Sequence, residues 1–192
     1  EHYRVRHPGI PFVALVDKTD GDKDWQGQWI SFPWERTKKD PGVKENITRI
    51  LQYIGEDPNR EGLRETQDRV IRSYGELFSG YKQDPASVFK TFEDGACNEM
   101  VVLKGIEFES LCEHHMLPFF GTAHIAYIPN GKIIGISKLA RLVEIYCRRL
   151  QVQERLTTQI TTAMDQYLHP KGTACIIEAR HFCMITRGVC KQ

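Results

Sequence analysis

The segment ESLCEHHMLPFFG, residues 109–121, lies between two stretches that have the composition of β-strands. Met100–Phe108 precedes it and Thr122–Ile128 follows it, and both are rich in β-branched and other apolar residues. A turn at residues 129–131 (Pro-Asn-Gly) then leads into Lys132–Ile136, which predicts a β-hairpin. The middle of the chain is therefore expected to form antiparallel strands.

Helical periodicity flanks these strands on both sides. Apolar residues recur at helical spacing from Val43 to Ile54, and a second helix is expected from about Thr66, as its N-cap, to Phe78. Two further helices are expected at Lys138–Leu150 and Gln153–Leu168, and a last strand from about Thr173 to Ile185. The sequence predicts an α+β fold in which helices back an antiparallel sheet.

The composition is that of a globular protein with balanced charge. The 192 residues are 41% hydrophobic, and 26 basic and 25 acidic residues leave a formal net charge of +1. This balance predicts no general attraction to nucleic acid or to a membrane surface. No apolar run approaches the roughly 18 residues that a membrane span requires.

The chain is expected to divide into an N-terminal arm, residues 1–42, and one domain, residues 43–192. The arm contains Trp25, Trp29 and Trp34 without clear periodicity, and it is expected to pack on a neighbouring surface or to be partly disordered. Residues 1–6 lack the basic and then apolar pattern of a signal peptide. Since the six cysteines are irregularly spaced, a reduced, cytoplasmic chain is expected.

Thiols and imidazoles gather at two places in the sequence. Cys112 and His115 are three residues apart, a spacing that allows one turn to aim both at the same ion. On the expected last strand His181 and Cys183 share a face, about 6–7 Å apart. The simplest interpretation is zinc on Cys112, His115 and Cys183, with a fourth position open to water as in catalytic sites.

The spacing alone leaves other interpretations open. Cys112 and Cys183 are also compatible with buried apolar thiols, or with a disulfide in an oxidised chain. His114, beside His115, is equally compatible with an ordinary hydrogen-bonded histidine.

Five blocks in a fixed order closely resemble the zinc-dependent GTP cyclohydrolase I family. The blocks are residues 109–121, 126–129 (AYIP), 135–141 (GISKLAR), 149–156 (RLQVQERL), and 181–183 (HFC) with 187–189 (RGV). Residues 55–63 and 66–74 are also similar to that family, so the resemblance covers about residues 43–191.

The resemblance implies an assembly and a reaction. The fold expected is the tunnelling fold, in which sheets of several subunits join into a barrel and two rings stack as a homodecamer. Active sites are then expected at subunit interfaces, built from more than one chain. The implied reaction opens the GTP imidazole ring at C8, releases formate and recloses the product to 7,8-dihydroneopterin triphosphate, the first step of pteridine biosynthesis.

The resemblance also implies a role for individual residues. Cys112, His115 and Cys183 match the family's zinc ligands, and His114 and His181 match its acid/base histidines. Glu154 matches the carboxylate that pairs with the guanine edge, and Gln153 matches a neighbour in that pocket. The phosphate-binding positions are matched by Lys138, Arg141, Arg69 and Arg187. Ser137 matches a residue near the ribose and phosphates, and it is also expected to cap the helix that starts at Lys138.

Two alternatives and one departure accompany the resemblance. A relative of the same fold reduces a nitrile on a deazapurine with a nicotinamide cofactor, and an inactive zinc-stabilised scaffold is a second alternative. The family usually continues past Arg187-Gly188 with a Ser/Thr-rich strand and a short helix, whereas this sequence stops at Gln192. A truncated or incompletely recorded C-terminal end is therefore expected, or else an edge that is built differently.

Overall fold

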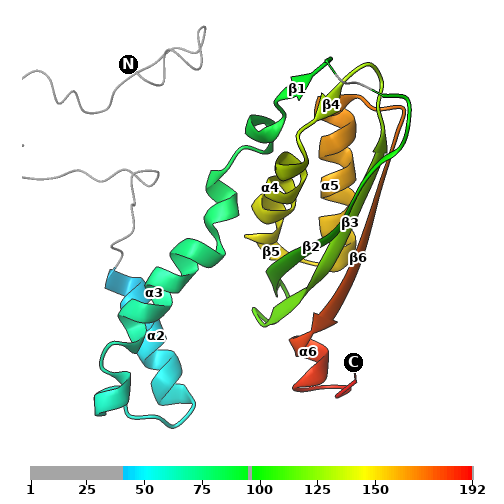
Figure 1. Ribbon diagram of the computed structural model, residues 1–192. Coiled ribbons are helices and arrows are strands. Elements are labelled where there is room, and N and C mark those ends of the chain that lie inside the picture. Colours follow the sequence, from blue (N-terminus) through cyan, green and yellow to red (C-terminus); the bar gives the residue numbers. More distant parts are fainter. Residues whose placement is uncertain (1–40, 95–96, 192) are drawn as a thin grey trace, which may run out of the picture. The chain divides into compact units, whose positions relative to one another are not determined.

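The computed structural model describes residues 41–94 and 97–191 (Figure 1). The chain divides into two compact units, Glu1–Gly42 and Val43–Gln192, and the second contains almost all of the described residues. The arm expected at residues 1–42 lies almost wholly outside the described residues, so its packing and role remain predictions. Among the described residues, no helix is long and apolar enough to cross a membrane.

A four-stranded sheet with strand order β5-β2-β3-β6 forms the centre of the second unit. β2 (Val101–Cys112) pairs antiparallel with β3 (Pro118–Ile128), and β3 pairs antiparallel with β6 (Gly172–His181). The short β5 (Leu150–Gln151) adds to β2 in parallel. The mixture of helices and a mainly antiparallel sheet confirms the predicted α+β class.

The central strands extend further than their composition predicted. β2 continues to Cys112 and β3 begins at Pro118, so the strands enter the segment 109–121 from both ends. Ser110 pairs with Phe119 in this extension, and both residues are buried. The antiparallel ladder therefore closes down to the loop at residues 113–117.

The hairpin expected after residues 129–131 is wrong. β4 (Ile133–Ile134) pairs with β1 (Thr91–Phe92) in a separate two-stranded sheet and not with β3. The amide of Ile134 donates to the hydroxyl of Tyr127 at 3.2 Å, so a side chain of β3 takes the place of a backbone partner. Residues 132–136 therefore do not form an antiparallel partner of β3.

The last strand is also shorter than predicted, because it ends at His181. Residues Phe182–Ile185 form the short helix α6, closed by the Thr186 amide, which donates to the Phe182 carbonyl at 3.0 Å. His181 pairs with Phe119, and β3 begins one position earlier, so the chain beyond His181 has almost no length of β3 left to pair with. Cys183 therefore lies on a helix and not on the strand face that the sequence predicted.

Helices occupy the expected stretches with shifted ends. The α-helices are α2 (Pro41–Tyr53), α3 (Thr66–Leu77), α4 (Ile136–Cys147) and α5 (Gln153–Leu168), of which α5 has the predicted bounds. Short 3-10 turns are η3 (Glu61–Leu63), η4 (Ser79–Lys82) and η5 (Pro85–Val88). The predicted caps are wrong: Glu65 and not Thr66 precedes α3, and Gly135 precedes α4, which leaves Ser137 inside the helix.

One face of the sheet is covered by α4 and α5, which Figure 1 shows on the same side of β2, β3 and β6. The side chains buried between these layers are mainly aliphatic: Phe119, Ile125, Tyr127, Leu139, Leu142, Val143, Leu156, Ile160 and Met164. Alternate residues point to the other face. There Val102, Phe120 and Ile176 remain exposed within this single chain.

A substitution at Gly121 tests how closely the backbones of β3 and β6 approach each other. A Cβ at this position would lie 1.9 Å from the carbonyl oxygen of Glu178 on β6. We expect Gly121→Ala to lower the free energy of unfolding by about 1–3 kcal/mol or more, because backbone atoms must separate. The measurement is urea unfolding followed by circular dichroism.

Gly172→Ala is the matched control, since a Cβ on that glycine of the same sheet meets no atom within 4 Å. Equal stability of the two variants would show that the strands are further apart than described.

Candidate functional site

The loop at residues 113–117 turns tightly between β2 and β3. The amide of Cys112 donates to the Leu117 carbonyl at 2.9 Å, and the Met116 amide donates to the Cys112 carbonyl at 2.8 Å. Met116 has a φ of 53°, a left-handed conformation that costs energy in a residue other than glycine. The turn brings His115 Nδ1 to 3.9 Å from the sulfur of the buried Cys112.

Cys183 joins these two residues from α6. One potential ligand atom from each of Cys112, His115 and Cys183 lies within 4.8 Å of the other two. Ligands of tetrahedral zinc are about 3.5–3.8 Å apart, given zinc–sulfur and zinc–nitrogen bonds near 2.3 and 2.1 Å. The two thiols and the imidazole therefore fit one zinc ion after a small movement of side chains. The structure brings together the three residues that the sequence proposed as ligands.

The surroundings of Cys183 favour the protonated form of its thiol when no metal is bound. Burial raises its pKa, and a hydrogen bond with the Cys112 thiol raises it further. A metal ion that bound between these sulfurs would replace a proton, because the thiolate is the ligand form of cysteine. All six cysteines are free thiols, so the alternative of a Cys112–Cys183 disulfide is not the arrangement in this structure.

His114 lies beside the thiols but faces solvent. Its Nδ1 is 3.7 Å from the Cys112 sulfur, while its side chain is 63% exposed. Its Nε2 is 3.8 Å from a carboxylate oxygen of Glu113. Arg155 donates a short hydrogen bond to the other oxygen of Glu113, and this bond holds the pKa of the Glu113 carboxyl below its usual value.

His181 is held by two neighbours at the end of β6. Its ring stacks on Phe119 with 4.8 Å between ring centroids and 2° between planes. Its Nε2 is 2.9 Å from Gln153 Oε1, and Gln153 Nε2 donates to the Ile177 carbonyl at 2.9 Å. Because the amide nitrogen of Gln153 is engaged, its oxygen accepts from His181, which places the ring proton on Nε2 and leaves Nδ1 as the free acceptor.

Glu154 lies on the first turn of α5, directly after Gln153, and is exposed. The hydroxyl of Thr158 donates to the backbone carbonyl of Glu154 at 2.9 Å, so this contact does not use the Glu154 carboxylate.

The basic candidates are not brought to one place. Arg187 Nη1 lies 2.7 Å from His115 Nε2, beside the group of potential ligands. Ser137, Lys138 and Arg141 lie on the first turns of α4. Figure 1 shows this end of α4 near β4, at the end of the sheet opposite to α6. Arg69, on α3, forms an exposed ion pair with Glu65 at 2.7 Å.

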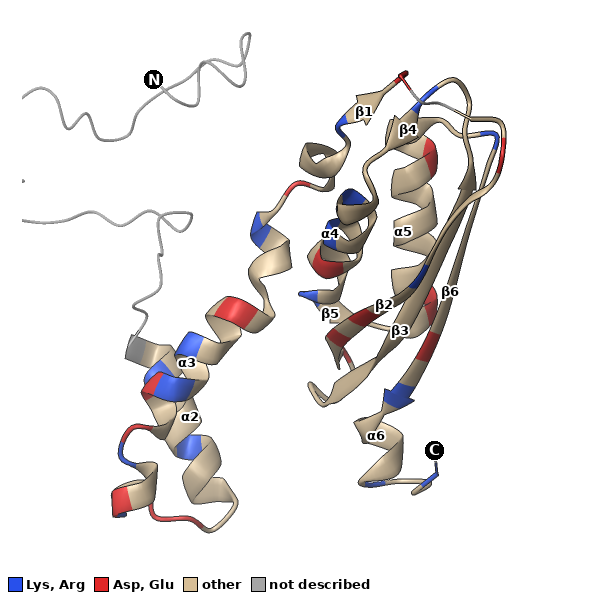
Figure 2. Cartoon of the chain, in the orientation of Figure 1, with Lys and Arg blue, Asp and Glu red and all other residues tan. Residues whose placement is uncertain are grey.

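Charges of both signs are interspersed along the helices, as Figure 2 shows for α2, α3 and α4. This distribution agrees with the formal net charge of +1. The triphosphate that the resemblance implies would therefore have to be attracted by a local group of cations and not by the field of the whole chain.

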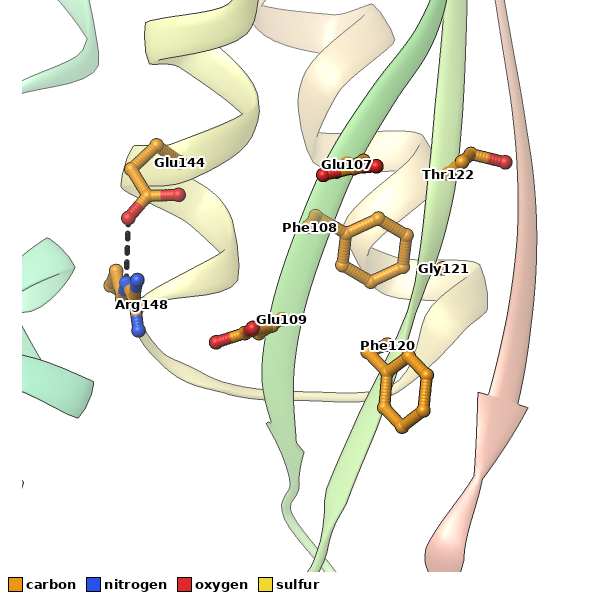
Figure 3. Close-up of a pocket in the computed structure, with 8 residues that line it drawn as sticks. All are labelled: Glu107, Phe108, Glu109, Phe120, Gly121, Thr122, Glu144 and Arg148. Atoms are coloured by element: carbon orange, nitrogen blue, oxygen red, sulfur yellow. Dashed lines mark hydrogen bonds and ion pairs between the residues drawn. The ribbon is translucent and has the colours of Figure 1, made fainter.

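A cavity of about 390 Å³ lies at the edge of β2, but its chemistry does not suit GTP (Figure 3). It is lined by Glu107, Phe108, Glu109, Phe120, Gly121, Thr122, Glu144 and Arg148. Arg148 is already paired with Glu144 at 2.6 Å, so two further carboxylates would face a bound triphosphate without compensation. None of the candidate site residues lines this cavity.

Sequence reasoning missed the contacts that support the loop at residues 113–117. Glu113 and Arg155 both lie in blocks quoted for the resemblance, but their spacing along the chain is long and carries no local pattern. The stacking of Phe119 under His181 was missed for the same reason, since it depends on the register between β3 and β6.

Comparisons with known proteins agree on one family. A family model described as GTP cyclohydrolase I matches residues 43–192, which contain every candidate site residue. The GTP cyclohydrolase 1 of Wolinella succinogenes is 57% identical over 151 residues, 78% of this chain and 81% of that protein. The GTP cyclohydrolase 1 of Chlorobium phaeovibrioides is 56% identical over 149 residues, 77% of this chain and 66% of that protein. That of Campylobacter curvus is 50% identical over 149 residues, 77% of this chain and 78% of that protein.

Proposed function

Because the chain belongs to the GTP cyclohydrolase I family, we propose that it hydrolyses the imidazole ring of GTP at C8 with release of formate. The opened product then recloses to 7,8-dihydroneopterin triphosphate, which starts pteridine synthesis. The match over residues 43–192 favours this hydrolase over a nitrile reductase or an inactive scaffold of the same fold. The observation that carries the proposal is the grouping of two thiols and an imidazole within 4.8 Å.

Zinc is the metal that this group suits best. Cys112, His115 and Cys183 supply two sulfur ligands and one nitrogen ligand, a set typical of zinc sites that keep a position open. A zinc ion bound there supplies the Lewis acidity that activates water toward C8 of the guanine. The remaining steps are proton transfers and substrate binding by the chain's own side chains.

The two further histidines suit the proton transfers. His114 adjoins Cys112 with a largely exposed ring, which supports a role in protonating N7 or a departing nitrogen. His181 keeps a fixed ring orientation through Gln153 and Phe119, and its free Nδ1 is the atom that would exchange a proton. Imidazole suits both roles because its ordinary pKa lies near neutrality.

Recognition of GTP requires an acceptor for the guanine edge and several cations. We assign the exposed carboxylate of Glu154 as the acceptor for the N1–H and 2-amino groups, with Gln153 beside it in the sequence. Arg187 is the first of the basic candidates, and its Nη1 lies 2.7 Å from Nε2 of His115, one of the proposed metal ligands. The other phosphate-binding candidates are Arg69, Lys138 and Arg141, with Ser137 near the ribose.

The separation of these cations supports sites shared between subunits. Lys138 and Arg141, with the neutral Ser137 beside them, lie at the far end of α4 from α6, which favours a second copy as the one that brings them to the potential metal ligands. We assign the assembly as a homodecamer of the tunnelling fold, with sheets joined into a barrel. We place the enzyme in the cytoplasm, where a reducing environment preserves free thiols as ligands.

Metal analysis separates the ligands from the proton carriers. The purified protein is expected to hold about one zinc per chain and to convert GTP to a product that fluoresces after oxidation. Cys112→Ser should lose the metal, whereas His114→Ala should keep it and lose about 10²–10⁴-fold in kcat. Zinc is measured by atomic emission and turnover by fluorescence.

Cys97→Ser is the control, because Cys97 is an exposed free thiol outside the ligand group. Equal loss of zinc in Cys112→Ser and His114→Ala would contradict the division of roles, and zinc without turnover in the intact oligomer would contradict the function.

Glu154 tests the recognition of guanine. Glu154→Gln replaces one of the two acceptor oxygens by an NH2 group, which is a donor and cannot accept from the guanine edge. We therefore expect kcat/KM for GTP to fall about 100-fold or more. Zinc content should not change. Glu45→Gln, an exposed position on α2, is the matched control. An unchanged kcat/KM in Glu154→Gln would remove this residue from the guanine pocket.

Mixing two inactive variants tests whether sites are shared. If Arg141 acts on the ligand group of another subunit, hybrids of Arg141→Ala and Cys112→Ser chains regain activity. In a random equal mixture about a quarter of the sites would contain an intact Cys112 and an intact Arg141. Activity is measured after the subunits are co-expressed. Hybrids that stay inactive, although co-purification of the two differently tagged variants shows mixed oligomers, would place both residues in one subunit's site.

A further inference from the structure

Arg155, which none of the proposed roles uses, links three elements around the candidate site. It lies on the first turns of α5 and is half-buried. Its Nε donates to Gln151 Oε1 at 3.1 Å, and its Nη2 donates to the Leu150 carbonyl at 3.0 Å and to the carboxylate of Glu113. The guanidinium therefore joins α5 to β5 and to the loop between β2 and β3.

The orientation of Arg155 is itself determined by a buried amide. Gln151 is 1% exposed, and its Nε2 donates to the Tyr146 carbonyl at 2.9 Å and to Gln159 Oε1 at 2.8 Å. Because both donors of the Gln151 amide are engaged, its oxygen is left to accept from Arg155 Nε. The guanidinium of Arg155 is therefore oriented by the buried side-chain amide of Gln151.

Glu113, which Arg155 contacts, lies directly between two candidate site residues in the sequence. Its amide donates to the Gln151 carbonyl at 3.0 Å, so backbone and side chain of Glu113 are both tied to neighbouring elements. Cys112 precedes it and His114 follows it in the sequence. The carboxylate oxygen that Arg155 leaves free lies 3.8 Å from His114 Nε2, which is within the distance of an ion pair but beyond that of a hydrogen bond, so Glu113 lies between Arg155 and the imidazole.

We propose that Arg155 is a positioning residue, which acts through Glu113 to hold the ring of His114 in its working orientation. The proposal rests on the proposed function, because it requires His114 to take part in proton transfer. Arg155 touches neither the ligand group nor a position assigned to GTP. Its effect is therefore expected on turnover, with binding of GTP and of zinc unchanged.

A plain surface salt bridge is the competing explanation. The side chains of Arg155 and Glu113 are 41% and 33% exposed, and ion pairs of such exposure stabilise a fold only slightly. A merely structural pair would thus leave kcat unchanged. A positioning pair would change kcat, because a displacement of about 1 Å in a reacting group can reduce a rate about 100-fold.

The acceptor geometry also predicts which substitution is tolerated. Arg155 reaches a carboxylate, a backbone carbonyl and a side-chain amide with separate N–H groups of one rigid plane. Lysine presents a single ammonium on a flexible stem and cannot reproduce this fork. Arg155→Lys should keep the attraction to Glu113 while it loses much of the orientation.

The test measures kcat, KM for GTP, zinc content and thermal unfolding for Arg155→Gln, Arg155→Lys, Glu113→Gln and the Arg155→Gln/Glu113→Gln double variant. Both single glutamine variants should lower kcat by about 10–100-fold, with KM within about twofold and zinc retained. Arg155→Lys should fall between them and the parent. The double variant should be no slower than the slower single variant, since both substitutions break one chain of contacts.

Arg60→Gln is the matched control, because Arg60 pairs with Glu56 at 2.7 Å with similar side-chain exposure and lies outside the site. It should leave kcat unchanged. Unchanged kcat in Arg155→Gln, multiplied effects in the double variant, or loss of zinc in step with activity would each overturn the positioning role.

The parent protein separates this failure from failure of the proposed function. A parent that binds zinc and turns over GTP, together with a fully active Arg155→Gln variant, refutes only the positioning role. A parent that does not turn over GTP refutes the function on which the proposal rests.

Discussion

The closure of β2 against β3 between Leu111 and Pro118 is the constraint on which the candidate site depends. It buries Cys112 at the end of one strand and limits the loop that follows to residues 113–117, which must then turn through the left-handed Met116. A shift of register by one residue would move Cys112 to the opposite face of the sheet. The hydrophobic pairing along the strands thereby determines where a thiol and an imidazole meet.

The same pairing of strands determines where Cys183, the third potential ligand, lies. β6 pairs with β3 until His181 faces Phe119, and β3 ends next to that position. The chain then coils into α6, which directs Cys183 back toward Cys112. A continued strand would have carried the chain straight on past the loop. The three potential ligands therefore come together because the pairing of β6 with β3 ends at His181.

Periodicity along the sequence correctly predicted those elements whose formation depends mainly on residues close together in the chain. The bounds of α5 follow from a regular apolar stripe and were predicted correctly, as was the α+β class. The ends of β2, β3 and β6 and the pairing of β4 with β1 depend on partners distant in sequence, and there the expectations were wrong. The grouping of Cys112, His115 and Cys183 was predicted from their residue types. The prediction that Cys183 lies on a strand was wrong, because it lies on α6. Glu113 and Arg155 lie 42 positions apart, so no periodicity could reveal their contact.

Exposure gives the strongest physical reason for a shared site. His114, His115 and Arg187 are exposed in this chain, and water around them weakens every charge-based interaction with a substrate. Hydrolysis of a stable ring needs fixed dipoles in an environment from which bulk water is excluded. The described residues of one copy supply the donors and potential ligands but not the enclosure. Exposed apolar residues on the free face of the sheet, Val102 and Ile176 among them, favour burial against further copies. In the homodecamer proposed above, an association that covers this face would also bring the distant cations of α4 to the potential ligands of a neighbouring copy, and the exposed loop would become an enclosed site.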